Sequence, residues 1–436
     1  MLDLIGSGLV SFWLGAAGVQ AKPLEAIELL ALQSSPALVL AAAPHPAEVA
    51  TIGQYLHGLE TEGLGRANQG IWMQSGPILM ANNNGTVPLP AASLTKIATT
   101  LAALKTWRSD GHFETLVSAT GPIANGVLQG DLVITGGGDP LFVWEEAIAL
   151  GNSLNSLGIH HVTGNLTIAG NFAMNFKSSP QIAGELLKQG LDSTTWKAAA
   201  KHQYSTLPPG TARPNVKISG VVQLQTIPNP KQILLLRHRS LHLSQILKEI
   251  NVYSNNDMAQ MLGDSLGGAS VVRQRAAAAA GVSESEILLK NTSGLGVENR
   301  ISPRAVCAMF MAIQRELQRD RMSVADLFPV SGVDHRGTLE ARHLPVGAVL
   351  KTGTLNDVSA LAGAIPTRDR GLVWFVIINR GWNIQRLRTS QDQLLQRLIA
   401  QWHLAPVVPA EIAPHYVDRT PTPLGGASRN DILYRT

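Results

Sequence analysis

Three strand-like runs near the carboxyl end of the chain limit its fold more than any other feature. Residues 348–354, 359–365 and 372–379 are rich in Val, Ile, Leu and Ala. The loops between them are short and polar, as in the Thr-Arg-Asp-Arg-Gly stretch at residues 367–371. Hydrophobic runs joined by such loops are typical of an antiparallel meander. We therefore expect an antiparallel sheet in this part of the chain.

Helical patterns lie on both sides of a central block of different character. A helix is predicted to begin near Ser93, because its apolar residues recur at three and four positions. Two short strands precede it, at residues 70–73 and 78–81. Further helices are predicted from about residue 240, around the alanine run at 276–280, and at 387–402.

The central block, residues 112–230, is β-rich and punctuated by glycine. Strands are predicted at residues 127–134 and 162–168, with a helix at 144–157 between them. This pattern indicates a separate β-rich domain inserted into a larger one. The predicted division is a leader (1–21), a first half (22–111), the insertion (112–230), a second half (231–405) and a Pro-rich tail (406–436).

Composition indicates a large folded protein and excludes several classes. The chain has 436 residues, of which 45% are apolar and 15% charged, and its net charge is only +4. It has no basic block, and aromatic residues make up 5%, which argues against nucleic acid as a partner. Its single cysteine, Cys307, excludes an internal disulfide and a cysteine-based zinc site, and its apolar surroundings predict a buried side chain.

The amino terminus has features of an export signal. No residue is charged between Asp3 and Lys22, and the apolar run ends in Val19-Gln20-Ala21. This pattern is typical of the hydrophobic region and cleavage site of a secretory signal, although the usual basic start is missing. Two interpretations stay open, a cleaved signal and an uncleaved membrane anchor, and both place the protein outside the cytoplasm.

The first candidate catalytic motif is Ser93-Leu94-Thr95-Lys96. Residues three apart on a helix share a face, so Ser93 and Lys96 are expected to be neighbours. A serine hydroxyl needs a base to become a nucleophile, and a lysine whose pKa is lowered can serve. No other lysine in the chain follows a serine at this spacing. Taken alone, the motif also fits a helix-capping serine beside a solvated lysine.

Two further motifs follow in the chain. Ser254-Asn255-Asn256 interrupts an apolar helical pattern and could relay a proton, although it also fits a turn or cap. Lys351-Thr352-Gly353-Thr354 lies on a predicted strand. It offers a positive charge, two hydroxyl groups and a glycine that permits close approach of a ligand to the backbone.

Together the motifs form a known signature. Ser-x-x-Lys, Ser-x-Asn and Lys-Thr-Gly occur in this order in serine β-lactamases and penicillin-binding proteins. The chain resembles the D-alanyl-D-alanine carboxypeptidases among the low-molecular-mass class C penicillin-binding proteins, from about residue 67 to 404. The separation of 161 positions from Ser93 to Ser254 favours this branch, because it leaves room for an inserted domain. Further stretches support the resemblance, at residues 130–140, 293–302, 337–342 and 376–381.

The resemblance implies an α/β (α+β) fold of the serine β-lactamase/transpeptidase type, with a five-stranded antiparallel sheet, a helical cluster and an inserted β-rich domain. It implies Ser93 as nucleophile, Lys96 as base, and Ser254 backed by Lys351 as proton relay. Asn256 would orient the peptide, and Thr352, Gly353 and Thr354 would line the place of its terminal carboxylate, with the backbone N–H groups of Ser93 and Thr354 as oxyanion hole. The implied partners are peptidoglycan stem peptides and inhibitory β-lactams in the periplasm. Neither a metal nor a cofactor is implied.

Two alternative functions remain open, and two other motifs give only weak indications of a site. A DD-endopeptidase that cuts peptidoglycan cross-links would use the same acyl-serine chemistry, and a non-catalytic peptidoglycan-binding module would share the fold. The Gly263-x-Ser265-x-Gly267 pattern matches the nucleophile elbow of α/β-hydrolases. That elbow requires a strand directly before it, whereas a helical segment is predicted here. Two histidine pairs, at 160–161 and at 238 and 242, lack the spacing and acidic partner of a metal site.

Overall fold

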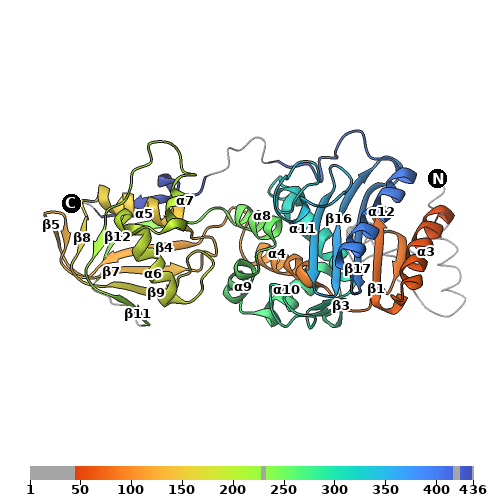
Figure 1. The fold of residues 1–436 in the computed structure, drawn as a ribbon, viewed down its shortest axis with the longest axis horizontal. Helices are drawn as coiled ribbons and strands as arrows, with labels where there is room; N and C mark the ends of the chain where they lie inside the picture. Colours follow the sequence, from red (N-terminus) through yellow and green to blue (C-terminus); the bar gives the residue numbers. More distant parts are fainter. Residues whose placement is uncertain (1–44, 227–231, 416–422, 435–436) are drawn as a thin grey trace, which may run out of the picture.

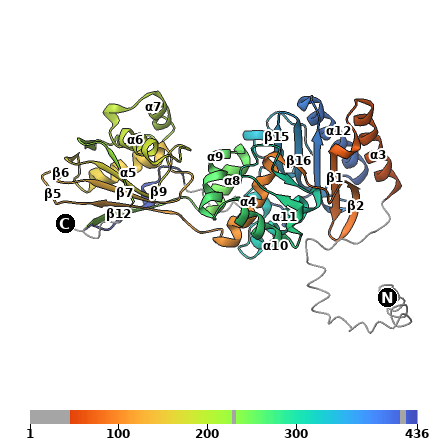
Figure 2. The ribbon, with the colours of Figure 1, turned by 90° about the horizontal axis from the view of Figure 1, so that it is seen from below.

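The chain folds into two lobes joined side by side (Figures 1 and 2). The computed structural model describes residues 45–226, 232–415 and 423–434. The predicted leader at residues 1–21 lies outside these ranges. Within them, no helix is long and apolar enough to cross a membrane.

The larger lobe is built on a five-stranded antiparallel sheet, as expected. The strand order is β15-β16-β17-β1-β2, and every neighbouring pair is antiparallel. The last three strands of the chain's main body form the predicted meander, and the amino-terminal hairpin extends it. The strands are β1 (Gln69–Ser75), β2 (Ile78–Asn83), β15 (Val349–Leu355), β16 (Val358–Thr367) and β17 (Gly371–Arg380).

Helices cover both faces of this sheet, which explains why β17 is apolar at nearly every position. Val373, Phe375 and Ile377 pack in one core cluster with α3 (Pro46–Thr61) and α12 (Ile384–Trp402). The alternate residues Trp374 and Val376 belong to a second core cluster, together with residues of the helices on the opposite face of the sheet. Successive strand residues point to opposite faces, so a strand between two helical layers is buried on both.

The helical cluster lies between the sheet and the second lobe (Figure 1). The predicted helices near residues 93, 240, 276–280 and 387–402 are confirmed, whereas α3 and α11 were not predicted. Cys307 is buried in α11, as expected, and burial raises the pKa of its thiol. The helices are α4 (Thr95–Thr106), α8 (Leu243–Tyr253), α9 (Asn256–Ser265), α10 (Ala269–Ala280) and α11 (Pro303–Gln318). A small sheet adjoins them, formed by β3 (Leu89–Pro90), β14 (Arg300–Ile301) and β13 (Ile287–Leu288).

The second lobe contains two sheets and three helices around its own core. A six-stranded sheet has the order β11-β9-β7-β4-β12-β18, and a four-stranded sheet has the order β10-β8-β6-β5. The predicted helix at 144–157 is confirmed as α5. The strands of the first sheet are β11 (Val222–Gln225), β9 (Leu166–Asn171), β7 (Leu132–Gly137), β4 (Glu114–Ala119), β12 (Ile233–Arg239) and β18 (Asn430–Ile432). The remaining elements are β10 (Lys217–Ile218), β8 (His161–Val162), β6 (Val127–Leu128), β5 (Ile123–Ala124), α5 (Trp144–Ser156), α6 (Pro180–Leu191) and α7 (Ala198–Tyr204).

The two strands predicted in the insertion are each broken in the structure. The run at 127–134 splits into β6 and β7 around Gly130, and the run at 162–168 splits into β8 and β9 around Gly164. The chain passes from one sheet to the other at these glycines, where Gly164 N donates to Gly130 O at 3.0 Å. A Cβ on Gly164 would lie 2.6 Å from that oxygen, so only glycine permits the approach.

Two strand pairings bear on the limits of the inserted domain. The sheet does not end at residue 230, because β12 pairs with β4 up to Arg239. The tail predicted at 406–436 also contributes a strand, since β18 pairs with β12 from His238↔Asn430 to Leu236↔Ile432. The high proline content of the tail therefore gave no indication that its terminal segment packs against the second lobe. We propose that this lobe comprises residues 114–239 and the segment around β18.

Candidate active site

Ser93 lies in a tight turn that leads directly into a buried helix. The turn, η2 (Ala92–Leu94), precedes α4, so Ser93 stands at the helix start as the sequence predicts. Ala92 has φ of 48°, a conformation that costs energy for a residue with a Cβ and is common at functional sites. Ser93 is partly exposed, whereas Lys96, one turn later, is completely buried. The pair therefore presents a hydroxyl to the outside and an amine to the core.

The Lys96 amine has three polar neighbours. Its Nζ lies 3.0 Å from Ser93 Oγ, 2.7 Å from Asn256 Oδ1 and 2.6 Å from the backbone oxygen of Ser293. Burial lowers its pKa from 10.5 to about 7. A neutral amine has two N–H donors and one lone pair. The two carbonyl-type oxygens accept both donors, so the lone pair remains for the proton of Ser93.

The second motif lies at the junction of α8 and α9. Two of its side chains are not used by the helices and can bond to other groups. Ser254 follows the last residue of α8 with φ of 54°, and Asn256 begins α9. Asn255 caps α9 by accepting from Met258 N at 3.0 Å. Asn255 is therefore a helix cap, whereas Asn256 bonds to Lys96 and Ser254 bonds to Lys351. Ser254 is half-buried and Asn256 is exposed, so both can be reached from solvent.

The third motif brings a second buried lysine to the same place. Lys351 Nζ donates to Ser254 Oγ at 3.0 Å and to the oxygen of Thr352 at 2.8 Å. Burial, and secondarily the charge of Lys96, lower the pKa of Lys351 well below its usual value. The hydroxyl of Thr352 donates to Thr338 Oγ1 at 2.8 Å, whereas Thr354 is exposed. Thr354 is therefore the more open of the two predicted carboxylate-binding hydroxyls.

Strand β15 forms the edge of the sheet and presents its backbone to η2. On this outer edge, Leu350 N donates to Pro329 O at 2.9 Å. Backbone N–H groups alternate along a strand, so the N–H of Thr354 points to the same side. A Cβ on Gly353 would lie 2.9 Å from Ala91 O and 3.1 Å from the Cβ of Ala92. Glycine thus lets β15 lie close to the turn that contains Ser93.

A loop at residues 291–299 completes the surroundings of Lys96. Asn291 Oδ1 accepts from Gly294 N at 2.8 Å and from Ser293 N at 3.2 Å, which holds the loop in a tight turn. Thr99 on α4 donates to Thr292 O at 2.7 Å and fastens the loop to the nucleophile helix. The amide oxygen of Asn291 therefore fixes the turn of this loop.

The structure brings all eight predicted residues into one region, although they come from three distant parts of the sequence. They are Ser93, Lys96, Ser254, Asn256, Lys351, Thr352, Gly353 and Thr354. Sequence reasoning missed the Ser293 carbonyl, because a backbone acceptor leaves no signal in residue type. It also missed Arg388 on α12, whose Nη2 donates to Thr354 Oγ1 at 2.8 Å.

The alternative motifs do not form sites in the described residues. Gly263, Ser265 and Gly267 lie at the end of α9 with no strand before them, and Ser265 Oγ donates to Met261 O within the helix. His238 is buried beside Glu146 and Asn430 rather than near another histidine. In the described ranges, no group of three or more His, Cys, Asp or Glu could hold a metal ion.

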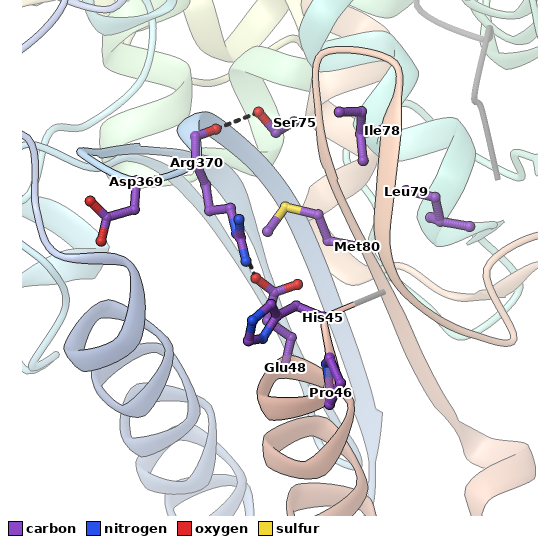
Figure 3. A pocket seen from close by; sticks show the side chains of 9 residues that line it. All are labelled: His45, Pro46, Glu48, Ser75, Ile78, Leu79, Met80, Asp369 and Arg370. Atoms are coloured by element: carbon purple, nitrogen blue, oxygen red, sulfur yellow. Dashed lines mark hydrogen bonds and ion pairs between the residues drawn. The ribbon is translucent and has the colours of Figure 1, made fainter. Parts of the chain in front are cut away.

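A pocket of about 590 Å³ lies far from this cluster, between the start of α3, the β1–β2 turn and the β16–β17 turn (Figure 3). Its main charged groups bind each other, since Arg370 Nε donates to Glu48 Oε1 at 2.7 Å. It adjoins the Thr367 end of β16, whereas the third motif pairs with Ser359 to Ala362, which at ~3.3 Å per residue lie roughly 17–26 Å away along the strand. The pocket is therefore separate from the candidate active site.

Comparisons with known proteins agree with this geometry. The D-alanyl-D-alanine carboxypeptidase DacB of Haemophilus influenzae is 23% identical over 421 residues, covering 73% of this chain and 86% of that protein. A D-alanyl-D-alanine carboxypeptidase of Actinomadura sp. is 27% identical over 276 residues, covering 56% of this chain and 47% of that one.

Solved structures share the fold. Penicillin-binding protein 4 of Haemophilus influenzae has a TM-score of 0.62 at 18% identity, over 80% of this chain and 99% of that one. A penicillin G-acylated predatory endopeptidase of Bdellovibrio bacteriovorus has a TM-score of 0.68 at 22% identity, over 84% and 99%. The family model described as D-Ala-D-Ala carboxypeptidase 3 (S13) matches residues 57–185 and 179–401, which is most of the sequence. The chain therefore belongs to the D-Ala-D-Ala carboxypeptidase 3 (S13) family of peptidases.

Proposed function

We propose that the protein is a serine-type D-Ala-D-Ala carboxypeptidase that acts on peptidoglycan stem peptides through an acyl-Ser93 intermediate. The observation that carries this proposal is the environment of Lys96. A completely buried amine with a pKa of about 7 lies 3.0 Å from a partly exposed serine hydroxyl. This arrangement suits acyl transfer at neutral pH, because the base is neutral for a large share of the time.

In the first half of the reaction, Ser93 Oγ attacks the carbonyl carbon of the penultimate D-alanine while its proton passes to Lys96. The backbone N–H groups of Ser93 and Thr354 stabilise the negative charge on the carbonyl oxygen. Ser254, which accepts from Lys351, donates a proton to the nitrogen of the departing D-alanine. The proton that Lys96 took from Ser93 then replaces the one that Ser254 gave up, so Lys96 is again neutral before water enters. The C–N bond breaks, and an ester to Ser93 remains.

In the second half, water attacks the ester and Ser93 is released. Lys96 takes the proton of the water and returns one to Ser93 Oγ, so that no metal or cofactor takes part in a step. Asn256 holds the peptide by its exposed amide while its Oδ1 keeps Lys96 in place. β-Lactams acylate Ser93 in the same way, as the penicillin G-acylated state of the Bdellovibrio protein suggests by analogy.

We place this reaction outside the cytoplasm, in the periplasm, where peptidoglycan is found. The uncharged run between Asp3 and Lys22 supports export. Whether that segment is cleaved as a signal or stays as a membrane anchor is open to a direct test, since amino-terminal sequencing of the exported protein would begin near Lys22 after cleavage.

The test compares two substrates with the wild-type protein and with Ser93→Ala. The first is a pentapeptide that ends in D-Ala-D-Ala, from which a carboxypeptidase releases free D-alanine. The second is a cross-linked stem-peptide dimer, which a DD-endopeptidase splits into monomers. The proposal expects D-alanine release by the wild-type protein and none by Ser93→Ala. Cleavage of the dimer alone would replace the carboxypeptidase with the endopeptidase, and an active Ser93→Ala protein would contradict the nucleophile.

A further inference from the structure

The arginine that touches the end of the third motif comes from a distant part of the chain. Arg388 lies in the second turn of α12, and its Nη2 donates to Thr354 Oγ1 at 2.8 Å. Thr354 is exposed at the open edge of β15, and Arg388 is half-buried beside it. Thr354 uses one of the five N–H donors of this guanidinium. The others remain available to a ligand that reaches Thr354.

Asp392 lies a single helical turn from Arg388 and its charge favours the guanidinium, but its oxygens bond to other groups. Asp392 accepts from Arg342 Nη2 at 2.6 Å and from Arg342 Nε at 3.0 Å, and also from His343 N at 3.1 Å. Both oxygens of Asp392 thus already accept hydrogen bonds from Arg342 or His343. Among the described residues, no carboxylate forms an ion pair with Arg388. The nearby Arg386 differs, because it pairs with Glu62.

The two lysines of the site are poorly suited to supply a lasting positive charge. Lys96 is buried and its pKa is lowered to about 7, and burial and the charge of Lys96 lower the pKa of Lys351 well below its usual value. Their Nζ atoms are also engaged with Ser93 and Ser254. A guanidinium stays protonated in proteins and presents a planar fork that fits a carboxylate. Burial and then the charge of Arg342 lower the pKa of Arg388, and the charge of Asp392 offsets this only in part, so a further anion at this place would stabilise the guanidinium.

We propose that Arg388 binds the terminal carboxylate of the substrate together with the hydroxyl of Thr354. This inference rests on the proposed function, because a carboxypeptidase substrate carries a free carboxylate one residue beyond the bond that breaks. Arg388 then makes the enzyme select peptides that end there. It acts as a substrate-binding residue and takes no part in the proton transfers.

The test uses two acyl donors that differ only in this carboxylate. The first is an acyl-D-alanyl thioester of thioglycolic acid, whose leaving group ends in a carboxylate like that of D-alanine. The second is the thioester of thioglycolamide, in which a neutral amide replaces the carboxylate. Thioesters are reactive enough for the neutral donor to be measured. Both are assayed with the wild-type protein, Arg388→Met, Arg388→Lys and the control Arg386→Met.

Arg388→Met is expected to lower kcat/KM for the charged donor about 10- to 100-fold, as for loss of a charged hydrogen bond, and to leave the neutral donor nearly unchanged. Arg388→Lys is expected to recover part of the loss, and Arg386→Met to behave as the wild type. An equal loss with both donors, or no loss with either, would overturn the role of Arg388. A wild-type protein that hydrolyses neither donor and takes up no benzylpenicillin would overturn the proposed function itself.

Discussion

Lys96 has the properties of a base because of where its amine is buried, not because of the residue type. Its chain is completely enclosed, and burial alone lowers its pKa from 10.5 to about 7. Two oxygens orient the amine, so its lone pair points to Ser93. In the proposed mechanism, the nucleophile and the base are thus prepared before a substrate arrives, which is the condition for fast acyl transfer.

Replacing Lys96 by arginine is expected to lower the rate of acylation by benzylpenicillin about 1,000-fold. A guanidinium does not lose its proton near neutral pH, so it cannot accept the proton of Ser93. The rate is measured by stopped-flow or by mass spectrometry of quenched samples. Lys105→Arg is the matched control, because Lys105 on α4 is more exposed and pairs with Glu316. A fully active Lys96→Arg protein would exclude Lys96 as the base.

The acylation rate is expected to rise with pH and to level off above pH 7. Lys96 must be neutral to act, and its lowered pKa means that the neutral form dominates only above about 7. Below that value the rate should fall about tenfold for each pH unit. The measurement is the second-order rate constant for benzylpenicillin from about pH 5 to about pH 9. A rate that stays constant between pH 5 and pH 7 would contradict the assignment.

At the scale of elements, the site depends on how closely β15 approaches the nucleophile turn. Gly353 makes this approach possible, because any side chain there would meet Ala91 and Ala92. Beyond Leu350, whose N–H donates to Pro329 O, the outer edge of β15 faces no further strand of its sheet in the described part of the chain. Sheet topology and one glycine therefore together create the candidate oxyanion hole.

Gly353→Ala is expected to lower the acylation rate at least tenfold. The added Cβ would lie 2.9 Å from Ala91 O, so β15 must move away from η2 and the two N–H groups separate. Gly58→Ala in α3 is the control, because its Cβ meets nothing within 4 Å and alanine favours the helix. Thermal unfolding of both variants shows whether the loss is local. An unchanged rate in Gly353→Ala would argue against the oxyanion hole.

Elements with a strong local pattern were predictable from the sequence, and others were not. The meander and α5 were predicted within a few residues, because each has a periodic apolar pattern and clear ends. The breaks at Gly130 and Gly164 were missed, since a change of sheet depends on contacts between segments far apart in the sequence. Arg388 was missed for the same reason, because α12 meets β15 only in the folded chain.

At the scale of the whole molecule, the carboxyl end ties itself to the second lobe. The turn η8 (Ala427–Arg429) and β18 lie against α5 and β12, within the second lobe (Figure 1). Arg429 is buried and donates to Glu146 and to Arg239 O. Buried charges need their partners, so this segment is part of the structure of the lobe.

Arg429→Met is expected to destabilise the second lobe by about 3–5 kcal/mol, because Glu146 would remain buried without its cation. Hydrogen exchange at the amides of β12 should become faster. Acylation of Ser93 should stay within about twofold of the wild type, since the change is remote from the candidate site. The control is Arg397→Met, which alters an exposed side chain of α12. Unchanged exchange in Arg429→Met would show that the terminal segment adds little stability.

The central claim is that Ser93 is a nucleophile activated by Lys96, and acylation tests it most directly. The purified protein is mixed with benzylpenicillin, its intact mass is measured, and the modified peptide is mapped. We predict a single stable adduct, located on Ser93 and absent in Ser93→Ala. An adduct on another residue, or no adduct while the drug stays intact, would contradict the account.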